Sequence, residues 1–180
     1  MKASILFLYL ALAGLSFAQE YPSTDHKWSV TTGQSVVLAD ASGAPVLTID
    51  NNAAAVHLVQ VLWSPDSKRV VVVEDYGRGS GLFAAWFDGK TWDKTVQTDE
   101  DGAAAIKQAL SAAGGRLQAE ARLARSWIDE KSVLIEGEFH FSSGASREFH
   151  YILEFTDSGG KRDRGGYLEG VIKGTHYELL

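Results

Sequence analysis

Short apolar segments separated by turns rich in Gly, Asp, Asn and Ser recur along most of this 180-residue chain. Some alternate apolar and polar side chains, as a strand with one buried face does, and others are continuously apolar. The pattern predicts about nine to eleven strands, near 26–31, 35–40, 45–50, 56–63, 69–76, 81–88, 116–126, 132–142, 147–156 and 167–173, with a weaker one at 92–97. We therefore expect a mainly β (α+β) fold, an antiparallel meander sheet or a sandwich.

One helix is predicted near residues 98–113. Thr98 is a suitable N-cap with Asp101 three residues later, acidic residues fill the first turn, and Gly114 and Gly115 end the segment. The next segment, 116–126, is ambiguous, because its apolar residues fit both a strand and a helical period. A strand is favoured, since the segment precedes Trp127 as "VHLVQVL" precedes Trp63.

Two segments are apolar without alternation, namely 69–76, with four consecutive valines, and 81–88, which reads "GLFAAWFD". Such runs are typical of strands buried on both faces. The predicted helix or a second sheet must then cover the second face. The side chains expected in the core are Trp63, Val71, Val73, Phe83, Trp86, Phe139 and Tyr151.

A repeat links three tryptophans. "WSVTTGQSVVLAD" begins at Trp28, "WSPDSKRVVVVED" begins 35 residues later at Trp63, and a weaker copy, "WIDEKSVLIEGE", begins at Trp127. A period of this size indicates a propeller or an array. Pro65 presets φ for the turn that follows Trp63, and the Asp66 side chain can bond to its own backbone.

The stretch Trp63-Ser64-Pro65-Asp66 and its strand resemble the WD40-like, TolB-type β-propeller repeat, in which Trp-Ser-Pro-Asp-Gly-Lys opens a blade hairpin. Ser67 stands where that family usually has Gly. The resemblance covers one hairpin well and implies no activity. A complete propeller is not expected, because even four blades need about sixteen strands.

The N-terminus has the pattern of an export signal. Lys2 is followed by an apolar run from Ile5 and by the small-residue pattern Ser16-Phe17-Ala18. This order is typical of a secretory signal peptide cleaved after Ala18. We expect a signal peptide over 1–18, a single globular β-rich domain over 19–180, and a secreted or periplasmic location.

The amino-acid composition excludes several kinds of chemistry and binding partner. The chain has no cysteine, which excludes disulfides, thiol catalysis and a lipid anchor after the signal. Its formal net charge of −6 argues against binding to nucleic acid and, after signal cleavage, to anionic membranes.

The glycine-rich segment 76–81 is interpreted as a hairpin tip and the acidic segment 97–102 as a helix start. No cofactor is expected, and the partner is an unidentified protein or small-molecule ligand.

A predicted hairpin contains the candidate metal ligands. Apolar side chains occupy the odd positions of both strands, so both sets must face one core. A three-residue loop over 144–146 preserves this parity and places His140 opposite His150. With their diagonal neighbours Glu138 and Glu148, these histidines could bind a divalent metal on the outer face. The alternatives are a polar face with incidental contacts and a ligand-binding surface.

Patterns of nucleophilic catalysis are missing from the sequence. Ser80 is not in a Gly-x-Ser-x-Gly elbow, and no His-Glu-x-x-His motif is present. The leading hypothesis is therefore an exported, non-catalytic binding or accessory domain. One alternative is a hydrolase that uses carboxylates or the His-Glu metal site. Another is a structural module that pairs with a partner through an open sheet edge.

Overall fold

The computed structural model describes residues 18–51, 58–77, 79–96, 111–156 and 172–179, which form twelve strands in three antiparallel sheets. Sheet A contains β1 (Gln19–Pro22), β2 (Trp28–Thr32), β3 (Val36–Asp40) and β4 (Pro45–Asp50). Sheet B contains β5 (Leu58–Trp63), β6 (Arg69–Asp75), β7 (Ser80–Phe87) and β8 (Trp92–Val96). Sheet C contains β9 (Leu117–Trp127), β10 (Ser132–Phe141), β11 (Ser146–Phe155) and β12 (Ile172–Leu179).

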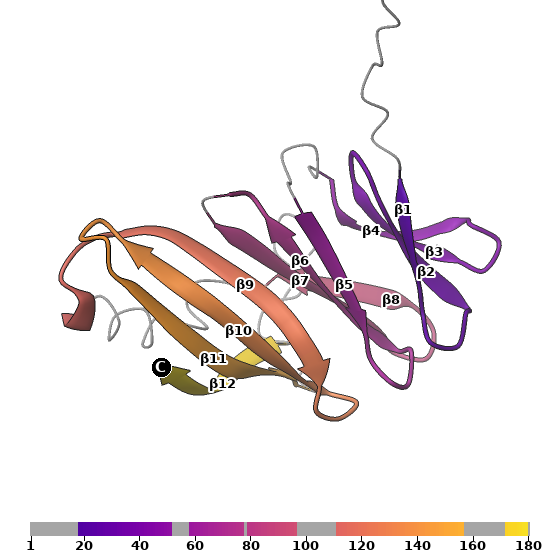
Figure 1. Ribbon diagram of the computed structural model, residues 1–180. Coiled ribbons are helices and arrows are strands. Elements are labelled where there is room, and N and C mark those ends of the chain that lie inside the picture. Colours follow the sequence, from indigo (N-terminus) through magenta and orange to yellow (C-terminus); the bar gives the residue numbers. More distant parts are fainter. Residues whose placement is uncertain (1–17, 52–57, 78, 97–110, 157–171, 180) are drawn as a thin grey trace, which may run out of the picture.

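Each sheet is a meander in which consecutive strands are neighbours (Figure 1). The predicted mainly β class is confirmed, and in the described part of the chain the sheets close into neither a barrel nor a propeller. The strand β1 was not predicted. The segment 116–126 is a strand, as favoured. Of the predicted helix, 111–113 is helical, whereas 98–110 lies outside the described residues.

Sheet B lies between the other two sheets, and its valines alternate between them. Val70 and Val72 pack in one apolar cluster with residues of sheet A, whereas Val71 and Val73 pack in another with residues of sheet C. All four are buried. The expectation that this strand is buried on both faces is confirmed, and a sheet covers each face.

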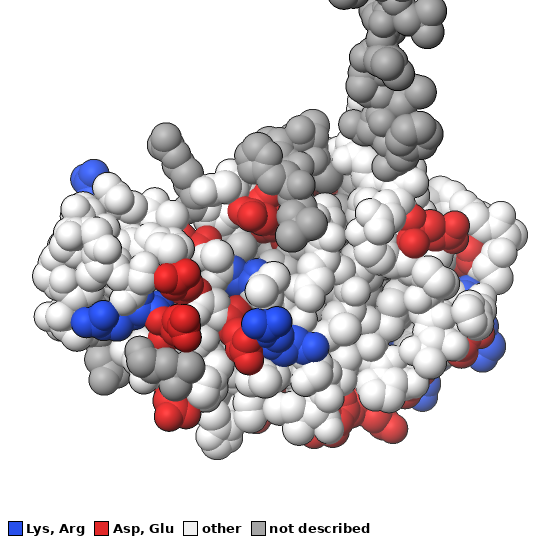
Figure 2. Space-filling view, in the orientation of Figure 1, with Lys and Arg blue, Asp and Glu red and all other residues white. Residues whose placement is uncertain are grey.

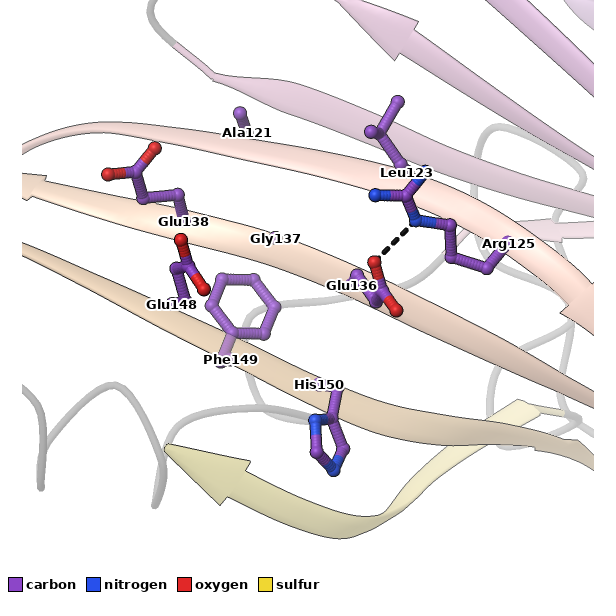
Figure 3. Close-up of a pocket in the computed structure, with 9 residues that line it drawn as sticks. All are labelled: Ala121, Leu123, Arg125, Glu136, Gly137, Glu138, Glu148, Phe149 and His150. Carbon is purple, nitrogen blue, oxygen red and sulfur yellow. Dashed lines mark hydrogen bonds and ion pairs between the residues drawn. The ribbon is translucent and has the colours of Figure 1, made fainter. Parts of the chain in front are cut away.

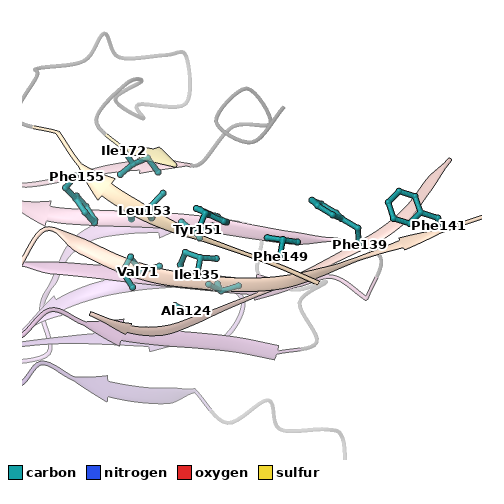
Figure 4. Packing of buried hydrophobic residues seen from close by; sticks show 14 residues of the cluster. Val71, Ala124, Ile135, Phe139, Phe141, Phe149, Tyr151, Leu153, Phe155 and Ile172 are labelled. Atoms are coloured by element: carbon teal, nitrogen blue, oxygen red, sulfur yellow. The ribbon is translucent and has the colours of Figure 1, made fainter. Parts of the chain in front are cut away.

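Most of the predicted core residues are buried. Val71, Val73, Phe83, Phe139 and Tyr151 are each less than 9% exposed. Trp63 and Trp86 are half-buried, because they lie near strand ends where the sheets meet solvent. The cluster between sheets B and C continues along sheet C as a row of aromatic rings (Figure 4).

The same turn joins the first two strands of sheets A and B. Each has the sequence Ser-x-Asp-x-Lys, and Ser64 follows Ser23 by 41 residues. The serine hydroxyl donates to the aspartate Oδ1, at 2.6 Å for Ser64 and Asp66 and 2.8 Å for Ser23 and Asp25. The lysine N–H donates to the same Oδ1 at 3.1 Å in both turns. The Asp66 side chain thus accepts a hydrogen bond from the backbone two residues later, as its turn position predicts.

The equivalence of these two turns shows that the 35-residue repeat aligned strands that are not equivalent. Trp28 begins β2, the second strand of sheet A, whereas Trp63 ends β5, the first strand of sheet B. Their alignment was therefore wrong, and Pro22 occupies the position in sheet A that Trp63 has in sheet B. Trp63 and Trp127 are equivalent, because Trp127 ends β9, the first strand of sheet C.

Two tryptophans connect neighbouring sheets. The indole N–H of Trp63 donates to the Tyr21 carbonyl of sheet A at 3.1 Å. The indole N–H of Trp127 donates to the Leu62 carbonyl of sheet B at 3.3 Å. Tyr21 and Leu62 are 41 residues apart and occupy equivalent positions in their sheets. The blade-like sequence therefore produces a stacked array in which each sheet is bonded to the preceding one.

The structure shows why Ser67 can stand where the propeller repeat usually has Gly. Its φ is 57°, in the left-handed region that favours glycine. Its hydroxyl, however, accepts a hydrogen bond from the Asp25 N–H at 3.0 Å, and the residue is buried. The side chain thus links the turns of sheets A and B, which glycine could not do.

Candidate functional site

The hairpin formed by β10 and β11 has a different register from the one predicted. His140 lies opposite Ser146, and His150 lies opposite Glu136. The loop again has three residues, but they are 142–144, because Gly144 adopts φ +83° at the last position. A glycine with positive φ is favoured there, as in a type I turn followed by a left-handed residue. The predicted pairing of His140 with His150 is therefore wrong.

The parity of the hairpin is nevertheless as predicted. The odd-numbered Phe139, Phe141, Phe149 and Tyr151 are buried on the inner face. The two histidines lie at even positions on the outer face, four residues apart along the strands, which corresponds to about 13 Å. The shift moved both strands by an even number of residues, so it left the faces unchanged.

The predicted metal ligands are spread over this outer face. His140 Nε2 lies 3.4 Å from Glu138 Oε2, and its Nδ1 lies 3.0 Å from the Ser146 hydroxyl. His150 Nε2 lies 2.9 Å from Glu178 Oε2 of β12. Glu148 lies directly opposite Glu138. Within the described ranges, no three His, Asp or Glu side chains form a group that could hold a metal ion.

What the outer face of sheet C does contain is an open groove of about 400 Å³, which we call the sheet C groove. Strands β9, β10 and β11 supply its lining (Figure 3). The lining residues are Ala121, Leu123, Arg125, Glu136, Gly137, Glu138, Glu148, Phe149 and His150. Three of the four candidate ligands, Glu138, Glu148 and His150, therefore line one groove.

Negative charge predominates in the sheet C groove. It contains three glutamates and one arginine, and the guanidinium of Arg125 is paired with Glu136. Glu148 forms neither an ion pair nor a hydrogen bond with another residue in the described part of the chain. Like charges directly opposite each other, such as Glu138 and Glu148, destabilise a sheet. Acidic side chains are conspicuous over sheet C in the space-filling view (Figure 2).

The floor of the groove depends on Gly137. A Cβ atom at this position would lie 2.3 Å from the Ala121 carbonyl oxygen and 2.4 Å from Cζ of Phe149. The ring of Phe149 thus packs against the glycine backbone and stacks on Phe139 with centroids 4.3 Å apart. This packing on the inner face holds the strands that carry the glutamates.

Sequence reasoning missed the part of the site that β9 supplies, namely Ala121, Leu123 and Arg125. The even parity of Glu136 could have placed it on the same face as Glu138. Parity could not show which β9 residues face the groove, because a register shift interrupts the pairing of β9 with β10 near Ala124. There the side chain of Gln60 bonds to both the N–H and the carbonyl of Ala124, at 2.8 and 2.7 Å.

Comparisons with protein-family models, with curated proteins and with solved structures find no significant match to this chain. Across the described residues, no helix has the length and apolar character needed to cross a membrane.

Proposed function

We propose that this protein is an exported, non-catalytic binding domain and that the sheet C groove binds a cationic group of a protein or small-molecule ligand. One observation carries the proposal: Glu148 lies unpaired and directly opposite Glu138 in an open groove. This arrangement costs stability in the free protein. A bound ammonium or guanidinium group would remove the repulsion and gain two charge-assisted hydrogen bonds.

Binding fits the groove better than hydrolysis does. Paired-carboxylate catalysis needs one carboxyl group held in its protonated form by an apolar environment. The side chains of Glu136 and Glu138 are 40% and 39% exposed, so water reaches both. Pairing through the long edge strand β9 is disfavoured by its bulge, which is a common protection of sheet edges.

A binding assay with tetralysine tests the proposal. We expect Glu138→Gln and Glu148→Gln each to weaken tetralysine binding by about two- to fivefold, since each removes one exposed charge contact. The double variant should lose about tenfold. Isothermal titration calorimetry at low salt measures the affinity. Glu148→Gln should also raise the free energy of unfolding by about 0.2–1 kcal/mol, because the like-charge pair disappears.

The matched control is the double variant Glu20→Gln and Glu130→Gln, which makes the same change in net charge at exposed positions outside the groove. It should bind tetralysine nearly as well as the unmodified protein. Equal losses in the two double variants would mean that the peptide responds only to overall charge, and the groove would not be the binding site.

Export is the second part of the proposal. It is supported by the signal-like pattern of the first 18 residues and by the start of the first described strand at Gln19, directly after the predicted cleavage site. Fusion of residues 1–22 to a reporter should carry the reporter across a membrane, and N-terminal sequencing of the exported full chain should begin at Gln19. Uncleaved protein that begins at Met1 in the membrane fraction would contradict this.

A further inference from the structure

A glutamate is buried where sheets A and B meet. Glu74 in β6 has no solvent exposure and follows the same parity as Val70 and Val72, which face sheet A. Its Oε2 accepts a hydrogen bond from the Tyr76 hydroxyl at 2.5 Å. Its Oε1 is also buried and has no hydrogen-bond partner among the described residues. A carboxylate in this position would keep one oxygen without compensation, which is costly in a protein interior.

Residues of β4, β5 and β7 lie around Glu74. On β4, Asp50 acts on the Glu74 carboxyl through its negative charge. The neighbouring strands β5 and β7 present Val59 and Gly81 opposite Glu74, neither of which is charged. Lys94 on β8 directs its Nζ to the Ile49 carbonyl at 3.2 Å.

Tyr76 occupies space that is free because Gly81 has no side chain. A Cβ atom there would lie 3.2 Å from both Cε2 and Oη of Tyr76. Gly81 thus makes room for the tyrosine that is hydrogen-bonded to Glu74. From its sequence, segment 76–81 was predicted only to be a hairpin tip.

We propose that Glu74 holds a proton at the junction of sheets A and B, so that the junction is stabilised while this proton is bound and weakened when it is lost. The proton removes an uncompensated negative charge from a fully buried position. Glu74 is distant in sequence from the groove residues and belongs to the other interface of sheet B, so this inference does not depend on the proposed function.

The electrostatics agree with the geometry. The pKa of Glu74 is raised from 4.5 to about 7, mainly by burial; the Tyr76 hydrogen bond opposes this rise, and the negative charge of Asp50 adds to it. The folded protein therefore retains a proton that the unfolded chain releases near pH 4.5. The contribution of Glu74 to stability is therefore largest below that pH, falls as the pH rises from about 4.5 to about 7, and levels off above it.

Carbon-13 NMR of glutamate side-chain carboxyl groups tests the inference directly. In the full chain, the Glu74 signal should titrate with a midpoint near 7. Asp50→Asn should lower this midpoint, because it removes a negative charge, and Tyr76→Phe should raise it, because the ionised form loses a hydrogen bond. Titration of Glu74 in the ordinary range near 4.5 would overturn the proposal.

Unfolding measurements provide a second test. Between pH 5.5 and 8 the unfolding equilibrium constant of the unmodified protein should increase about tenfold to thirtyfold more than that of Glu74→Gln, since only the former releases the proton. The control Glu130→Gln, at an exposed turn position, should follow the unmodified protein. Parallel curves for the unmodified protein and Glu74→Gln would refute the proposal. If Glu74→Gln does not fold, the NMR midpoint decides.

Discussion

Val71→Asp is expected to prevent folding. Val71 has no solvent exposure and belongs to the cluster between sheets B and C. An unpaired carboxylate in such a site costs several kcal/mol. This is a large part of the free energy of unfolding of a typical domain, which is roughly 5–15 kcal/mol. The variant should show no cooperative thermal transition by circular dichroism and should accumulate as insoluble protein.

The matched control is Val46→Asp in β4, where the side chain is 44% exposed. The same chemical change there should alter the free energy of unfolding by only about 0.5 kcal/mol or less. A soluble Val71→Asp variant that unfolds cooperatively would show that β6 is not the central strand of the three-sheet stack.

Gly137→Ala is expected to destabilise the protein by roughly 2–4 kcal/mol. The added methyl group would overlap the Ala121 carbonyl oxygen, which is backbone, and the Phe149 ring, which is packed against Phe139. Neither neighbour can move without disturbing the pairing of β9, β10 and β11. Urea denaturation followed by tryptophan fluorescence measures the loss, and tetralysine binding should weaken as the sheet C groove is distorted.

Gly33→Ala serves as the control for this substitution. A Cβ atom at Gly33 would meet no heavy atom within 4 Å. It should change stability by about 0.5 kcal/mol or less. If Gly137→Ala were as harmless as Gly33→Ala, the Phe149 ring would have an alternative position, and the close packing under the groove would not be required for folding.

The local pattern of the chain predicted most of the strands and the inner and outer faces of the β10–β11 hairpin. The odd apolar positions of β10 and β11 predicted that Phe139 and Tyr151 face the core, and both are buried. This works because side chains alternate strictly along a strand. The four consecutive valines likewise predicted a strand that is buried on both faces.

The exact register was decided by one backbone conformation. Moving the loop from 144–146 to 142–144 preserves the parity, so the hydrophobic pattern accepts either register equally well. Gly144 selects the second one, because its positive φ fits the last loop position. The change separates His140 from His150 and brings Glu138 opposite Glu148, so it replaces a candidate metal site with an acidic groove.

The repeat, too, was only partly predictable from the sequence. Ser-x-Asp-x-Lys occurs twice in the sequence, but the more prominent tryptophans suggested an alignment that joins a strand start to a strand end. Only the packed structure reveals which Trp positions are equivalent, because their indole N–H groups bond to carbonyls of the preceding sheet.

The side-chain pattern alone therefore predicts the fold class, most of the strands and the faces of the hairpins, since these follow from periodicity within one or two segments. The tertiary structure decided which sheets cover β6, where β9 contributes to the groove, and the burial of Glu74 beside Asp50. These depend on contacts between residues far apart in the chain, and a polar residue such as Glu74 has the same local pattern whether it faces solvent or another sheet.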